Sequence, residues 1–202
     1  MGWSAPIIIK LRDPEKSPLP EPVTIVEESW IGSLVTIGAI LGPYISGFAI
    51  SKLGRKWALV CSSIPMLVSW SLIAVSTSLP MIYAARVLSG VYVGMSFTVG
   101  PLYLGEIATN NVRGAVNSFL GVGMNSGLLL IYSIGPYVSF AVTAYVGIVL
   151  SGISFILAML APESPYYYIA KDDLDAAGSA LMRLRGKSRK AVQSELDKME
   201  IE

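Results

Sequence analysis

The chain of 202 residues contains no histidine and a single cysteine, Cys61. Without imidazole groups, histidine-based acid–base catalysis and most zinc chemistry are excluded. One cysteine cannot form a disulfide within the chain, and the apolar run around Cys61 is typical of packing. The long apolar segments hold no pair of acids and no metal-ligand cluster. An enzyme is therefore the least favoured class, and we expect no catalytic residues, no metal and no cofactor.

Charge is also scarce. Charged residues make up 14% of the chain, whereas a soluble domain is usually about one-quarter charged. The net charge of +1 offers no basic surface, so we expect no nucleic-acid partner. Four long stretches have no charge at all, and they are residues 29–51, 57–85, 87–105 and 114–162.

These stretches predict an all-α, polytopic membrane helix bundle. About 20 helical residues span the hydrocarbon core, and Gly135-Pro136 divides the last stretch in two. The five predicted helices cover about 30–50, 57–78, 81–104, 115–134 and 138–161. Five buried helices of a soluble protein would need polar outer faces, which these segments lack.

The N-terminal residues do not resemble a signal peptide, because they lack a basic start followed by a long apolar core. Four prolines and many charges predict a solvated loop over residues 7–28. A loop on the outer side is normally carried across the membrane by a helix that precedes it. We therefore expect that the first helix of the bundle is missing from this sequence. Residues 1–4 would then lie at the outer end of that helix.

Lysine and arginine concentrate on the cytoplasmic side of membrane proteins. Eleven of them fall in connections 51–56, 105–114 and 163–202, and three fall in connections 1–29, 79–80 and 135–137. We therefore expect a multi-pass protein of the cell membrane. Its expected parts are an extracellular loop (1–29), a membrane domain (30–161) and a cytoplasmic helical segment (162–202).

Small residues recur every four positions within the predicted helices. Such ridges let helix backbones approach closely in lipid, which indicates a packed bundle. They are Gly38, Gly42 and Ser46 in the first helix, Gly90 and Gly94 in the third, and Gly123 and Gly127 in the fourth.

Three polar side chains within the helices need partners. Asn117 and Asn125 are eight residues apart and project on similar faces of one helix. They either hydrogen-bond neighbouring helices or line a path for a polar, uncharged solute, since amides both donate and accept. Arg86 lies about one turn from its helix end, where it can reach water or pair with an acid.

The connections carry further signals. Gly54 provides a tight turn before Arg55 and Lys56. Pro101 is expected to bend its helix where Glu106 emerges, and Arg113 begins the next one. These opposite charges can pair with each other or with a neighbouring domain, and a solvated pair is worth about 0–1 kcal/mol, a weak lock.

The tail predicts two short amphipathic helices. Asp172 or Asp173 can cap a first helix that runs to about Arg185 and stops at Gly186, and Ser188 can cap a second. Their apolar faces are predicted to pack against the cytoplasmic face of the bundle, and a membrane-lying orientation is the alternative. The apolar residues are Leu174, Ala177, Leu181 and Leu184 in the first, and Ala191, Val192, Leu196 and Met199 in the second.

Together these motifs resemble the sugar porter family of the major facilitator superfamily, and more closely its insect facilitated trehalose transporters and glucose transporters. The matching residues are Gly47, Gly54, Arg55 and Lys56; Arg86 and Gly90; Pro101, Tyr103, Glu106, Arg113 and Gly114; and the Pro-Glu-Ser-Pro of Pro162, Glu163 and Pro165. Ser51 stands where the family has an acid.

The resemblance implies an incomplete N-terminal half of a major facilitator fold, with family helices 2 to 6 and the start of the intracellular helices. In the family, cytoplasmic charges hold two halves together, and the halves rock around a central sugar. By resemblance, the gate consists of Arg55, Lys56, Glu106, Arg113 and Glu163, and Asn125 lines the sugar path, with Asn117 on the same helix. The implied partners are a sugar, the lipid bilayer, and a missing C-terminal half or another membrane chain.

Three functions therefore remain open. The chain is part of a transporter of trehalose or a hexose working by alternating access. Otherwise it is a truncated, non-transporting membrane protein, or a major facilitator for another small solute such as an organic ion.

Overall fold

The computed structural model describes residues 4–13, 17–109 and 111–201, all of whose regular elements are helices. Five of these helices are long and apolar enough to cross a membrane, which confirms the predicted bundle. They are α2 (Ile25–Leu53), α3 (Arg55–Ala74), α4 (Leu79–Ile107), α5 (Arg113–Ile134) and α6 (Phe140–Leu160). The short helices are α1 (Ser4–Leu11), α7 (Pro165–Ile169), α8 (Leu174–Arg185) and α9 (Arg189–Ile201).

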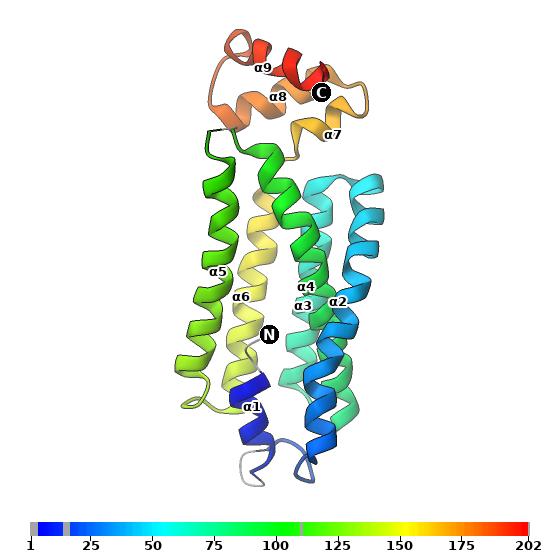
Figure 1. Ribbon diagram of the computed structural model, residues 1–202, viewed down its shortest axis with the longest axis vertical. Helices are drawn as coiled ribbons and strands as arrows, with labels where there is room; N and C mark the ends of the chain where they lie inside the picture. The colour runs from blue at the N-terminus through cyan, green and yellow to red at the C-terminus, as the bar shows by residue number, and fades with distance from the viewer. Residues whose placement is uncertain (1–3, 14–16, 110, 202) are drawn as a thin grey trace.

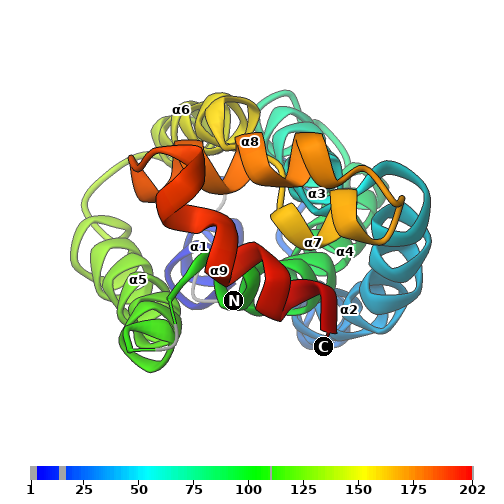
Figure 2. The same ribbon diagram turned by 90° about the horizontal axis from the view of Figure 1, so that it is seen from above.

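The short helices lie at opposite ends of the bundle (Figure 1). Helices α7, α8 and α9 cover one end, which we call the α7–α9 end, and α1 lies at the other, the α1 end. Viewed from above, α8 and α9 extend across the ends of the long helices (Figure 2). The two turns α2–α3 and α4–α5 therefore lie next to the tail helices.

Glycine contacts bring α2 and α4 together. A Cβ atom on Gly38 would lie 2.1 Å from the carbonyl oxygen of Val87, and one on Gly90 would lie 2.1 Å from that of Val35. One helical turn further on, Gly42 and Gly94 face each other in the same way. The predicted ridges on these two helices are thus confirmed as the surfaces along which their backbones meet.

Helix α5 differs from the rest of the bundle. It lies at one edge in both views (Figures 1 and 2), and none of its described residues is buried. A Cβ atom on Gly123 or Gly127 would meet no heavy atom within 4 Å. The third predicted ridge therefore has no partner among the described residues.

The solvated loop predicted over residues 7–28 is wrong for its first part. Helix α1 carries Ile7 and Leu11, both 0% exposed, into the core at the α1 end. There they join a cluster with Ile31, Ile82 and Phe140. Local prolines and charges indicated a loop, but these tertiary contacts stabilise one short helix. Residues 1–3, expected at the outer end of a missing helix, lie outside the described residues.

Helix α2 begins about five residues earlier than predicted because of a capping box. The hydroxyl of Thr24 accepts the backbone N–H of Glu27, and the Glu27 carboxylate accepts the Thr24 N–H at 2.7 Å. Two backbone donors at the helix start are satisfied in this way. At the other end of the bundle, α4 continues past Pro101 to Ile107 instead of ending near residue 104.

The two predicted tail helices are confirmed as α8 and α9. The Asp173 carboxylate accepts the Ala176 N–H at 3.0 Å, and Gly186 ends α8 with a left-handed φ of 62°. Ala177, Leu181, Val192 and Leu196 form a small core between the two helices. The remaining predicted apolar positions, Leu174, Leu184, Ala191 and Met199, lie at least partly exposed around this core.

Candidate functional site

The α2–α3 turn depends on glycine at position 54. Gly54 has a φ of 96°, a conformation that side chains with a Cβ atom rarely adopt. A Cβ there would also lie 2.6 Å from a Glu163 carboxylate oxygen and 3.0 Å from the Tyr167 ring. The turn therefore brings the start of α3 directly against the α6–α7 connection.

This turn positions Arg55 opposite Glu106 on α4. The Nε–H of Arg55 donates to both carboxylate oxygens of Glu106, at 3.0 and 3.1 Å. The two side chains are only 20% and 13% exposed. The buried hydroxyl of Ser164 donates to the same carboxylate, so Glu106 joins α3, α4 and the α6–α7 connection.

Glu163 makes a second link between the same segments. One of its carboxylate oxygens accepts the backbone N–H of Lys56 at 2.9 Å and that of Ser164 at 3.0 Å. The carboxylate thereby satisfies an open donor in the first turn of α3, where negative charge is favourable. Lys56 thus takes part through its backbone and not through its ammonium group.

Tyr103 completes the arrangement. It is buried on α4, and its hydroxyl donates to the carbonyl oxygen of Pro162 at 2.7 Å. We call the group of Arg55, Tyr103, Glu106, Glu163 and Ser164 the gate network. Its contacts join segments that are 51 to 107 residues apart in the chain.

The tail helices are tied to the gate network by Arg185. Its guanidinium donates to the carbonyl oxygen of Ile107 at 2.8 Å and to Glu195 at 2.7 Å. The last turn of α4, which carries Glu106, is therefore connected to both α8 and α9.

Arg113 does not join the network. It begins α5, is exposed, and forms no ion pair among the described residues. The structure pairs Glu106 with Arg55 of the same bundle and not with Arg113. Gly114 beside it is exposed, and a Cβ atom on it would meet no heavy atom within 4 Å.

The two candidate lining amides on α5 have different surroundings. Asn125 is exposed, and its amide donates to the Gly121 carbonyl in its own helix at 2.8 Å. Asn117 is half-buried, and its Oδ1 is a buried oxygen without a partner among the described residues. A cavity of about 380 Å³ between α3, α4 and α6 includes neither amide in its lining.

Sequence reasoning left Arg86 either reaching water or pairing with an acid, and its 4% exposure argues against contact with water. Its Nε–H donates to the carbonyl oxygen of Ile31 on α2 at 3.0 Å. The guanidinium thus joins α4 to α2 near the α1 end. Gly90, one turn along from Arg86, takes part in the α2–α4 glycine contact, so this motif is structural.

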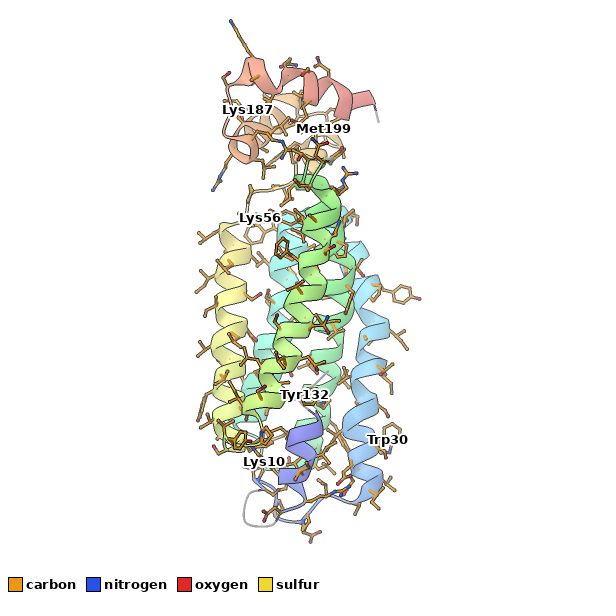
Figure 3. All side chains as sticks on the ribbon, turned by 60° about the vertical axis from the view of Figure 1, so that its left-hand side comes forward. Lys10, Trp30, Lys56, Tyr132, Lys187 and Met199 are labelled. Carbon is orange, nitrogen blue, oxygen red and sulfur yellow. The ribbon has the colours of Figure 1, made fainter. Side chains whose placement is uncertain are left out.

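Sequence reasoning missed a polar contact at the α1 end. Lys10 is 7% exposed, and its ammonium donates to the carbonyl oxygens of Gly135 and Val138. Figure 3 shows Lys10 at the α1 end and Lys56 at the opposite end. The Arg12 guanidinium donates to the Glu28 carboxylate, and this contact raises the pKa of Arg12. In the sequence, the charged residues near the N-terminus are the only feature that could have indicated these contacts.

Comparison with known proteins gives consistent results. The family model described as "Sugar (and other) transporter" matches residues 12–202. The facilitated trehalose transporter Tret1 of Apis mellifera ligustica is 34% identical over 204 residues, covering 100% of this chain and 40% of its own length. That of Bombyx mori is 31% identical, covering 93% of this chain and 36% of its own. The chain thus spans less than half the length of these relatives.

Solved structures show the same fold. The proton:xylose symporter XylE bound to 6-bromo-6-deoxy-D-glucose superposes with a TM-score of 0.80 at 17% identity, covering 98% of this chain and 49% of its own. A partially occluded inward open conformation of XylE from E. coli also gives a TM-score of 0.80. The bundle is therefore part of a major facilitator fold. With the family model matched over nearly the whole chain, this chain belongs to the sugar (and other) transporter family.

Proposed function

We propose that this chain forms part of the N-terminal half of a sugar carrier that moves trehalose or a hexose by alternating access. Its family and the trehalose transporters among its relatives support the substrate class. The observation that carries the proposal is the ion pair between Arg55 and Glu106, which holds two long helices together at one end of the bundle. Such a contact can open and close a path.

We further propose that the α7–α9 end faces the cytoplasm of a plasma membrane. The connections at this end and the tail hold eleven lysine and arginine residues, against three in the connections at the other end. This asymmetry follows the positive-inside rule. The gate network is then a cytoplasmic gate.

The energy of the network suits this role. Contacting residues of one salt-bridge network couple by about 0.5–3 kcal/mol, which is small enough for the Arg55–Glu106 contact to break and re-form. Breaking it would release the two charged groups at this end of the bundle, while α3 and α4 stay packed along their lengths. The two halves of such a carrier rock around a central site, so a second half, from the same protein or another membrane chain, completes the path. Asn117 and Asn125 would contribute hydrogen-bonding groups for sugar hydroxyls.

Helix α5 supports one alternative. Because none of its described residues is buried, the chain presents a whole helix for contact with lipid or another chain. A non-transporting membrane protein that assembles through α5 would show the same feature. The other alternative is a carrier for a different small solute. Uptake measured with several labelled substrates distinguishes it from a sugar carrier.

Uptake measurements test these functions. The chain is expressed in cells without endogenous sugar uptake, alone and together with the C-terminal half of a trehalose-transporter relative. Labelled trehalose, glucose and an organic cation are then supplied. We expect sugar uptake in the paired case, reduced at least tenfold by Glu106→Gln and unchanged by Glu21→Gln, an exposed acid near the α1 end. No sugar uptake in either case, with both chains in the membrane, would contradict the proposal.

A further inference from the structure

A cleft of about 620 Å³ lies beside the gate network, between the α2–α3 turn, the α6–α7 connection and α8. Its polar and aromatic lining includes Lys56, Trp57, Glu163, Tyr167, Ser179 and Arg183. The gate network uses the Lys56 backbone and the Glu163 carboxylate, but it leaves the cationic groups of this cleft without a function.

The two cations of the lining have no acidic partner. Among the described residues, neither the Lys56 ammonium nor the Arg183 guanidinium forms an ion pair. The lining holds one carboxylate, Glu163, one of whose oxygens accepts two backbone N–H groups. A third cation lies beside the cleft, because the Lys171 ammonium is 4.5 Å from the centre of the Tyr167 ring. Positive charge therefore exceeds negative charge here.

The cleft also borders the apolar surface of the spanning helices. Leu53 and Trp57, the last residue of α2 and the third of α3, are 46% and 47% exposed. Exposed tryptophans at the ends of membrane helices favour the level of the lipid headgroups. The cations of the cleft thus suit a lipid headgroup, and its apolar side chains suit the acyl chains.

We propose that this cleft binds the anionic phosphodiester headgroup of a membrane lipid. Arg183 supplies a planar fork for phosphate oxygens and Lys56 a point charge. Trp57 and Leu53 contact the glycerol and upper acyl chains. The bound lipid connects the α2–α3 turn to α8, so it stabilises the closed arrangement of the gate network. The inference needs membrane insertion but not sugar transport, so each can fail without the other.

Native mass spectrometry of the full chain in neutral detergent tests the site, with phosphatidylglycerol as the probe and phosphatidylcholine as the zwitterionic reference. A cation near the headgroups contributes about fivefold in affinity. We expect about fivefold weaker binding of phosphatidylglycerol for Lys56→Gln or Arg183→Gln, and about twentyfold for the double variant. Lys187→Gln is the matched control, since Lys187 lies between α8 and α9 and outside the cleft (Figure 3).

Three results would overturn the proposal. They are unchanged binding in the double variant, an equal loss in Lys187→Gln, and displacement of the lipid by inorganic phosphate at equal concentration, which would show a free anion as the ligand. If the variants fail to fold, a measurement on the unaltered chain still tests the proposal. Phosphatidylglycerol should slow hydrogen exchange of residues 176–183 more than phosphatidylcholine does, and equal exchange rates would also exclude the site.

Discussion

A Cβ atom placed on Gly42 would lie 2.5 Å from the α carbon of Gly94, so the backbones of α2 and α4 touch at these two residues. Gly42→Ala must push the helices apart, because both atoms belong to rigid backbone. Overpacking of this kind costs about 1–3 kcal/mol. We expect a lower free energy of unfolding by that amount, measured by detergent-induced unfolding with circular dichroism. Gly32→Ala, in the same helix with no atom within 4 Å, should leave stability unchanged or raise it.

Replacement of Gly54 by alanine should disrupt the turn between α2 and α3. The φ of 96° and the nearby Glu163 carboxylate both oppose a side chain at this position. We expect a loss of about 1–3 kcal/mol in stability. Hydrogen exchange at the Lys56 amide should accelerate, because Glu163 is displaced from its cap. Gly47→Ala, at an open position of α2, should change neither quantity, and equal effects in the two variants would contradict the role of Gly54.

The ion pair between Arg55 and Glu106 can be measured by a double-mutant cycle. Glutamine substitutions remove each charge and keep most of the side-chain volume. Because the two side chains are mostly buried and share a hydrogen-bond network, we expect a coupling energy of about 0.5–3 kcal/mol. The matched cycle between Arg113 and Glu106 should give a coupling close to zero. A larger coupling for Arg113 than for Arg55 would mean that the structure pairs the wrong residues.

Lys10→Met should loosen the α1 end. The ammonium holds two carbonyl oxygens of the α5–α6 connection, and the variant leaves them without that donor. A hydrogen bond to a charged group contributes about 1.5–3 kcal/mol. Hydrogen exchange in residues 4–13 should therefore become at least tenfold faster. Lys52→Met, an exposed lysine at the other end of the bundle, serves as the control, and similar exchange in both variants would refute the anchoring role.

Much of the bundle is predictable because the bilayer imposes a simple rule on the chain. Stretches without charge of about 20 residues indicate spans, and glycines spaced by four indicate contact ridges, as Gly38 and Gly90 confirm. Helix α1 was missed because the prolines and charges over residues 7–28 indicated a loop. Its helix depends on burial of Ile7 and Leu11, which only the fold can reveal.

Three members of the gate network, Arg55, Glu106 and Glu163, were among the predicted gate residues. Glu106 was expected to pair with Arg113, seven residues away, or with a neighbouring domain, and in the structure it pairs with Arg55, 51 residues away. Spacing in the sequence gives only the separation of two charges along the chain. The conformation of the α2–α3 turn determines which charged side chains lie in contact. The lining role of Asn125 stays a prediction, because its amide bonds its own helix.

The Lys10 contact has a consequence for the order of assembly during synthesis. Its acceptors, Gly135 and Val138, lie 125 and 128 residues further along the chain. Residues 4–11 are synthesised before helices α2 to α6, but the Lys10 contact cannot form until the α5–α6 connection has been made. Helix α1 therefore precedes α2 to α5 in synthesis but reaches its final position only after them, and its docking reports that the chain has been made at least as far as residue 138.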